Sequence, residues 1–291
     1  MRTKELGTTG VRIPEIGTGC YLYRGSADLL RQGVEWGATL IDTAEYYGNE
    51  ELVGQAIRGI RDRVFVATKT HHWHRQDVIR CAEASLRRLG IETIDLYQIH
   101  WPNSAIPIEE TMSAMEQLAD EGKLRNIGVS NFTLPELRRA QRSLRKHRIV
   151  SNQVRYSIVH RTIEPHLLPY CQANQITVIA YSPLGQRFAS LAEADRDGSL
   201  ASVAAETGKT IAQVALNWCI AKPGIVTIPK TESAEHLAEN CRSSGWRLTE
   251  AQMKLLNEGV RFRMRGRLEL ALRGLVRGAI QYYRELKAKR A

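Results

Sequence analysis

The stretch VFVATKTHHWHRQDVIRCAEASLRRLGIETIDLYQIH (residues 64–100) decides the fold, because it contains a complete strand–helix–strand unit. Its two ends, VFVATKT and IDLYQIH, are β-branched or apolar runs that finish on polar residues. Between them, VIRCAEASLRRLG has the apolar spacing of an amphipathic helix. A helix between two strands returns the chain to the same end of the sheet, so this stretch predicts parallel strands.

Runs of the same kind recur along the whole chain. The eight runs are PEIGTGC, ATLIDTA, VFVATKT, IDLYQIH, NIGVSN, IVSNQV, ITVIAY and GIVTIP. Eight strands that alternate with helices over 291 residues predict a closed (β/α)8 barrel, or TIM barrel. The alternative is a doubly wound open sheet, whose nucleotide-binding form carries G-x-G-x-x-G after its first strand. GTGCYL (17–22) fails that pattern, because Leu22 stands at the third glycine.

The two ends of the chain differ from this repeating pattern. TKELGTTGVRIP (3–14) has two short extended segments around a glycine-containing turn, which predicts a β-hairpin placed to plug the bottom of the barrel. Because no linker or repeat divides the chain, we expect one barrel domain over residues 1–260 and a tail over 261–291.

The positive charge lies mainly in this tail. Of the net charge of +10, the segment 261–290 contributes +8 from ten Lys or Arg against two Glu. Its apolar residues recur at helical spacing with arginines on the other side, which predicts a basic amphipathic helical extension. The apolar residues are Leu268, Leu272, Leu275, Ala279, Tyr283 and Leu286, and the arginines are Arg273, Arg277 and Arg284. We expect the helix to pack on the barrel or on a second subunit; contact with an anionic membrane surface or an acidic partner is the alternative.

Composition excludes several other classes of protein. No apolar run approaches the roughly 20 residues that cross a bilayer, and the N-terminus lacks the apolar core of a signal peptide, so we expect a soluble cytoplasmic protein. Nucleic-acid binding is not expected, because the barrel contains no recognised nucleic-acid module. The five cysteines are scattered without a C-x-x-C pair, which indicates reduced structural thiols: Cys20, Cys81, Cys171, Cys219 and Cys241.

Polar residues stand where the predicted strands end, and the carboxyl ends of the strands form the active site of a (β/α)8 barrel. In chain order they are Asp42, Lys69, His100, Ser130 with Asn131, Gln153 and Tyr181. A lysine ammonium lowers the pKa of a nearby tyrosine, and a carboxylate keeps a buried lysine protonated. A histidine can donate a hydrogen bond to a substrate oxygen. Each residue also has a structural interpretation, as a helix cap, a structural ion pair or a satisfied polar side chain.

These residues lie in motifs that resemble those of the aldo-keto reductase family. The motifs are IDTAEYYGNE, the lysine of VATKT, DLYQIHWP, GVSNF, NQVRY, AYSPLG and IPKTESAEHLAEN, in family order from about residue 17 to 240. The resemblance implies NAD(P)H-dependent reduction of aldehydes and ketones to alcohols by hydride transfer, with no metal. It also implies that Tyr47, rather than its neighbour Tyr46, is the general acid, and that Asp42, Lys69 and His100 complete the catalytic set.

The same resemblance implies the cofactor site. Ser130, Asn131 and Gln153 would hold the carboxamide, Tyr181 would stack on the nicotinamide, Ser182 and Leu184 would contact the pyrophosphate, Lys230 and Thr231 would hold a phosphate, and Glu239 and Asn240 would hold the adenine. At His236, many NADPH-dependent members have an arginine. Histidine has fewer donors and is largely neutral near pH 7, so we expect NADPH with a weakened grip and leave NADH open.

The substrate and any metal are less clearly encoded. By resemblance Tyr21, Trp73 and Trp101 line the pocket, which suits apolar or aromatic aldehydes and small dicarbonyls; such aromatics are also common packing residues. HHWH (71–74) has histidines at a spacing that suits zinc, but no further ligands cluster nearby in sequence, so we predict no metal site.

The sequence leaves one further function open and disfavours another. A cofactor-binding regulatory or scaffold subunit, attached to a membrane or protein partner through the basic tail, stays open. A barrel glycosidase is disfavoured, because Asp42 has no second acid at a strand end.

Overall fold

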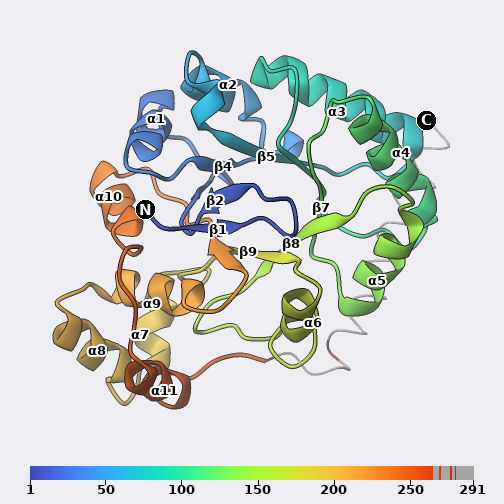
Figure 1. The fold of residues 1–291 in the computed structure, drawn as a ribbon. Coiled ribbons are helices and arrows are strands. Elements are labelled where there is room, and N and C mark those ends of the chain that lie inside the picture. The colour runs from blue at the N-terminus through green and yellow to red at the C-terminus, as the bar shows by residue number, and fades with distance from the viewer. Residues whose placement is uncertain (265–268, 270–275, 277–278, 280–291) are drawn as a thin grey trace.

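The structure, a computed structural model, describes residues 1–264, 269, 276 and 279. Eight parallel strands form one sheet in chain order, and helices surround it (Figure 1). The strands are β3 (Thr18–Gly19), β4 (Leu40–Asp42), β5 (Phe65–Thr70), β6 (Leu96–Ile99), β7 (Ile127–Ser130), β8 (Ile149–Arg155), β9 (Thr177–Tyr181) and β10 (Ile225–Thr227).

Backbone hydrogen bonds close this sheet into a barrel. The amide of Gly17 donates to Thr227 O at 2.8 Å, and the amide of Thr227 donates to Glu15 O at 2.9 Å. These bonds join the last strand to the segment that leads into β3. The predicted (β/α)8 barrel is confirmed, and the open-sheet alternative is wrong.

The helices lie in the connections between strands or, for the last two, after β10. They are α1 (Ala27–Glu35), α2 (Glu50–Ile57), α3 (Arg75–Leu89), α4 (Ile108–Asp120), α5 (Leu134–Ser143), α6 (Leu167–Ala173), α7 (Ala189–Ala194), α8 (Ser199–Thr207), α9 (Ile211–Ile220), α10 (Ala234–Cys241) and α11 (Glu250–Gly259), with the 3-10 helices η1 (Glu45–Tyr47) and η2 (Arg61–Arg63). Their ends follow local sequence. For example, Thr210 and Gln213 form a capping box at the start of α9, and Gly90 ends α3 in the left-handed conformation.

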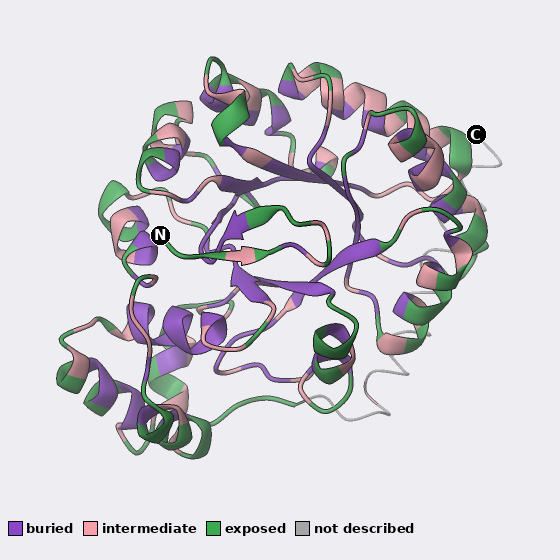
Figure 2. Cartoon of the chain, in the orientation of Figure 1, coloured by how far each residue is buried: buried purple, intermediate pink, exposed green. Residues whose placement is uncertain are grey.

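Burial follows the layers of the fold. In Figure 2 the strands of the eight-stranded sheet are largely buried, and exposed residues lie on the helices, on the loops and on the N-terminal hairpin. The predicted hairpin is present, with β1 (Thr3–Glu5) antiparallel to β2 (Arg12–Pro14). Leu6 and Ile13, both fully buried, pack with Leu40 and Leu96, the first residues of β4 and β6. The hairpin therefore plugs the barrel at the amino ends of the strands, which leaves the carboxyl ends for a site.

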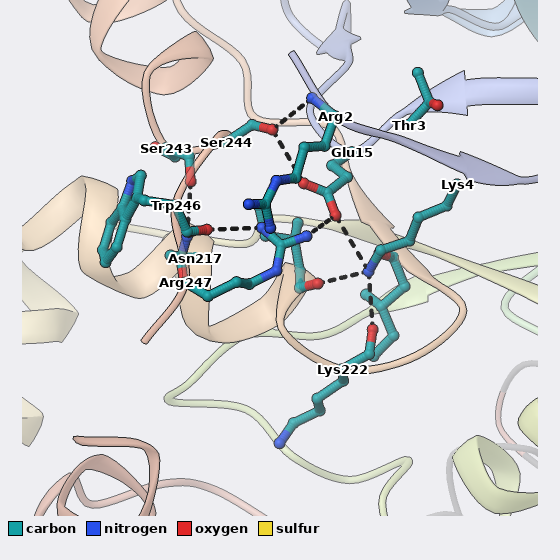
Figure 3. Close-up of polar contacts among 12 residues, drawn as sticks. Arg2, Thr3, Lys4, Glu15, Asn217, Lys222, Ser243, Ser244, Trp246 and Arg247 are labelled. Carbon is teal, nitrogen blue, oxygen red and sulfur yellow. Dashed lines mark hydrogen bonds and ion pairs between the residues drawn. The ribbon is translucent and has the colours of Figure 1, made fainter. Parts of the chain in front are cut away.

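Charged side chains fasten this plug to the wall. Lys4 Nζ donates to three main-chain oxygens, of Ile220 at 2.5 Å, Lys222 at 2.9 Å and Ile225 at 2.8 Å (Figure 3). The buried carboxylate of Glu15 pairs with Arg247 and accepts a hydrogen bond from Ser244 Oγ at 3.0 Å. The hairpin is thus tied to the end of α9 and to the segment that follows α10.

The tail is described only in part. The amide of Arg263 donates to Val159 O at 3.0 Å, and the amide of Arg161 donates to Arg263 O at 3.1 Å, so Arg263 is joined to the loop between β8 and α6. The predicted basic helix lies almost wholly outside the described residues, so it and the division at residue 260 stay predictions. Among the helices that the structure describes, none is long and apolar enough to span a membrane.

Candidate active site

Asp42 and Lys69 form a buried ion pair at the carboxyl ends of neighbouring strands. Lys69 is fully buried in β5, and its Nζ donates to Asp42 Oδ1 at 2.6 Å and to Thr43 O at 2.7 Å. Burial lowers the pKa of Lys69, and the Asp42 carboxylate opposes that shift. The pair therefore places one ammonium inside the barrel, held on two acceptors.

Two amides complete the surroundings of Asp42. Gln153 Nε2 donates to Asp42 Oδ2 at 2.7 Å, and Gln98 Nε2 lies 3.5 Å from the same oxygen. In this structure the Gln153 amide thus orients Asp42, a contact that the sequence did not predict. Gln98 was not predicted as a site residue at all. A signal was present, because side chains two residues apart on a strand face the same way, and Gln98 stands two residues before His100.

Tyr47 lies beside this pair on η1. Its hydroxyl is 3.4 Å from His100 Nε2, and Lys69 Nζ is 5.1 Å from its ring centroid. Tyr46, by contrast, is 73% exposed. Gly48 follows in the left-handed conformation, with φ of 68°, and so allows the chain to turn into α2 directly after Tyr47. The structure thus brings Tyr47, and not Tyr46, to the predicted catalytic residues.

The acidity of Tyr47 differs from the sequence expectation. A neighbouring lysine was expected to lower its pKa, but burial raises the pKa of the hydroxyl well above its ordinary value, and the Asp42 charge adds to the increase. Desolvation is the largest cause, because the phenol is largely enclosed and its charged form would lose contact with water. The phenol therefore stays protonated at neutral pH.

His100 is neutral in the same surroundings. Burial lowers its pKa to about 2, and the charges of Lys69 and His71 act in the same direction. The ring centroids of His71 and His100 are 4.0 Å apart. The sequence indicated His71 only as a potential metal ligand, although its position two residues after Lys69 is a signal that it shares the inward face.

Three further predicted residues form a hydrogen-bonded chain beside His100. Asn131 Nδ2 donates to His100 O and to Ser130 Oγ, both at 3.0 Å, and Tyr181 OH donates to Asn131 Oδ1 at 2.8 Å. Asn131 has φ of 64°, in the left-handed region that asparagine tolerates better than most residues. The ends of β7 and β9 thus present an amide, a hydroxyl and a phenol to the active-site end.

The residues predicted for the phosphate gather at the start of α10. Ser233 Oγ accepts from the amide of His236 at 3.3 Å, which caps the helix, and Ser233 N donates to Thr231 Oγ1 at 3.1 Å. Lys230 Nζ lies 2.7 Å from Glu232 Oε1. A helix N-terminus with a cation favours an anion. In this structure the Lys230 ammonium is paired with the carboxylate of Glu232, a contact that the sequence did not predict.

The remaining predicted cofactor residues, Ser182, Leu184, Glu239 and Asn240, contact other parts of the protein or are buried in it. Ser182 O accepts from the amide of Gly185 at 3.0 Å in a turn, and Leu184 packs against buried apolar residues. Glu239 accepts a hydrogen bond from Thr210 Oγ1, which links α10 to α9, and Asn240 is buried.

The three aromatic residues take different positions. Tyr21 is 57% exposed, and its ring meets the Tyr47 ring edge to face at 5.1 Å. Trp73 is half-buried against the core, donates from Nε1 to Trp101 O at 2.8 Å and accepts at its own carbonyl from Thr111 Oγ1 at 2.6 Å. Tyr21 therefore borders Tyr47, whereas Trp73 joins the loops after β5 and β6 to α4.

Comparison with known proteins agrees with this geometry. The model of the Aldo/keto reductase family matches residues 15–260. The methylglyoxal reductase YeaE of Escherichia coli is 36% identical over 271 residues, which cover 89% of this chain and 95% of the relative.

Solved structures agree as well. A thermostable aldo-keto reductase, Tm1743, solved with the inhibitor epalrestat, is 40% identical with a TM-score of 0.81 over 88% of this chain and 99% of its own. An aldo/keto reductase from Klebsiella pneumoniae, solved with NADP and acetate, is 37% identical with a TM-score of 0.77 over 89% of this chain and 95% of its own. The chain therefore belongs to the aldo-keto reductase family and is an NAD(P)-dependent oxidoreductase that acts on small-molecule carbonyl groups.

Proposed function

We propose that this protein reduces aldehydes and ketones to alcohols with Tyr47 as the general acid. The observation that carries the proposal is the 3.4 Å contact of Tyr47 OH with His100 Nε2, next to the buried Lys69–Asp42 pair. A phenol with a raised pKa holds its proton until a carbonyl oxygen gains negative charge. The nicotinamide cofactor, when bound, supplies the hydride to the carbonyl carbon.

The other three residues support that proton transfer. Neutral His100 can donate one hydrogen bond to the substrate oxygen and so orient the carbonyl toward Tyr47. The Lys69 ammonium stabilises the phenolate that Tyr47 becomes after it gives up its proton. Asp42, with Gln98 and Gln153 on its second oxygen, fixes the position of that ammonium.

The residues present fit a nicotinamide cofactor. Asn131 offers an amide beside the Tyr181 phenol and the Ser130 hydroxyl, a set that matches the donors and acceptors of a carboxamide. Lys230, 38% exposed at its side chain and next to the N-terminus of α10, suits a phosphate. We propose NADPH as the preferred cofactor, with Lys230 exchanging Glu232 for the phosphate, and NADH as a weaker substitute.

The substrate class follows from the exposed border of the site and from the relatives. Tyr21 flanks Tyr47 and stays 57% exposed, so the entrance offers an aromatic edge. A relative of 36% identity is named a methylglyoxal reductase. We propose small dicarbonyls and aromatic aldehydes as substrates.

The experiment is a spectrophotometric assay of NADPH and NADH oxidation with methylglyoxal, benzaldehyde and a simple ketone. Oxidation that depends on the carbonyl, and is faster with NADPH, supports the proposal. If cofactor binds but none of the carbonyls is reduced, the reductase proposal fails, and the alternative of a cofactor-binding regulatory subunit gains support.

A further inference from the structure

Three potential metal ligands from different elements of the fold lie close together. Glu45 begins η1, His72 lies in the loop after β5, and Cys81 lies in α3. Their ligand atoms all lie within 4.8 Å of one another, and His72 Nε2 is 3.8 Å from Glu45 Oε1. Glu45 is 27 residues before His72 in the sequence, so HHWH alone did not indicate that the fold supplies this partner.

We propose that Glu45, His72 and Cys81 bind a thiophilic divalent cation, with Zn²⁺ as the matching probe. A carboxylate, an imidazole and a thiolate are the ligand types of zinc, at roughly 2.0–2.3 Å from the ion, and water can fill a fourth position. Tetrahedral ligands at those lengths stand roughly 3.3–3.6 Å apart. The atoms here must therefore approach by little more than about 1 Å, which side-chain rotation can supply.

The surroundings favour entry of a cation. A cavity of about 490 Å³ opens beside Glu45 and His72, and Glu50, Glu51, His71 and Arg88 are among its other lining residues. The Arg88 guanidinium lies 2.6 Å from the Glu50 carboxylate, so its charge is compensated locally. The His72 side chain is 45% exposed and is therefore accessible to solvent, whereas the Glu45 side chain is only 11% exposed.

The site is joined to the catalytic residues through Glu45. Glu45 Oε1 accepts hydrogen bonds from Thr70 Oγ1 at 2.9 Å and from the amide of His71 at 2.6 Å. Thr70 and His71 are the two residues that follow Lys69. Glu45 also stands two residues before Tyr47 on the same short helix. A cation that binds the Glu45 carboxylate competes with the hydrogen bonds from Thr70 and His71 and displaces η1. We therefore infer that the bound cation slows carbonyl reduction. This last step rests on the proposed function, whereas cation binding does not.

The test is isothermal titration of the full chain with Zn²⁺, with turnover measured over the same concentrations. We expect one ion per chain, and turnover that falls at the concentration where the site fills. His72→Ala and Cys81→Ala are expected to weaken binding at least tenfold and to restore turnover at that concentration. His74→Ala is the matched control, because His74 lies two residues from His72, has a 40% exposed side chain and contacts Glu110 instead; it should behave as the unaltered chain does.

The outcomes separate the two parts of the proposal. Binding that is absent, or unchanged in both His72→Ala and Cys81→Ala, overturns the site. Binding that needs these ligands but leaves turnover unchanged overturns the link to Tyr47. Because titration requires no catalysis, a failure of the proposed reductase function would leave the binding result readable. Circular dichroism of each variant without metal verifies that lost binding does not arise from misfolding.

Discussion

Lys69 Nζ lies 2.6 Å from Asp42 Oδ1, and neither residue is more than 2% exposed. Removing one member of such a buried pair leaves the other charge without compensation. Lys69→Met is therefore expected to lower the free energy of unfolding by about 3–5 kcal/mol, measured by denaturant titration.

A double variant tests whether the loss arises from the stranded charge. Lys69→Met combined with Asp42→Asn should recover part of the lost stability, because both charges are then absent. The single variant Asp42→Asn is measured as well. If the free-energy losses of the two single variants add up to the loss in the double variant, the two residues do not act as a pair.

His100 should make the protein less stable in acid. Its folded pKa is lowered to about 2, below the value of about 6.5 in the unfolded chain, so the unfolded state binds a proton first as pH falls. The stability that comes from keeping His100 neutral is fully present above the unfolded pKa and is lost as the pH falls below it. At pH 5 this loss lowers the free energy of unfolding by about 2 kcal/mol.

The comparison that isolates this contribution is His100→Gln against the unaltered chain. The free energy of unfolding, measured at pH 7 and pH 5, should fall by about 2 kcal/mol less in the variant. An equal fall in both proteins would show that His100 does not hold a lowered pKa.

The ion pair between Lys230 and Glu232 should limit preference for NADPH. Glu232→Gln frees the Lys230 ammonium for a phosphate, so the ratio of kcat/KM for NADPH over NADH should rise. An exposed pair is worth up to about 1 kcal/mol, which corresponds to a rise of up to about fivefold. Glu235→Gln, which removes an acid in the first turn of α10, is the control. An unchanged ratio in Glu232→Gln would mean that the pair does not oppose the cofactor.

The hairpin plug should affect stability without affecting the reaction. Glu15 is 1% exposed and pairs with Arg247 at the end of the barrel opposite the candidate active site. Glu15→Gln is expected to lower the free energy of unfolding by about 3 kcal/mol. At a temperature where the variant is folded, its kcat/KM should equal that of the unaltered chain. A selective loss of kcat/KM would show that the plug is coupled to the catalytic residues.

The sequence predicted those features that depend on local pattern. Seven of the eight strands lie within their predicted runs, and β8 extends one residue beyond its run, to Arg155. Asp42, Lys69, His100 and Tyr47 do meet at one end, because alternation and strand ends are readable from neighbouring residues. Features that depend on burial or on distant partners were missed. The raised pKa of Tyr47 is a desolvation effect, and the Gln153 contact with Asp42 joins residues 111 positions apart.

The central claim is that Tyr47 donates the proton, and the direct measurement is the carbonyl-dependent rate of NADPH oxidation in Tyr47→Phe and Tyr46→Phe. Loss of a general acid typically costs a factor of roughly 10²–10⁴. We predict a loss of that size in Tyr47→Phe, with cofactor binding retained, and a rate close to that of the unaltered chain in Tyr46→Phe. A Tyr47→Phe variant that still reduces methylglyoxal at the unaltered rate would contradict the account.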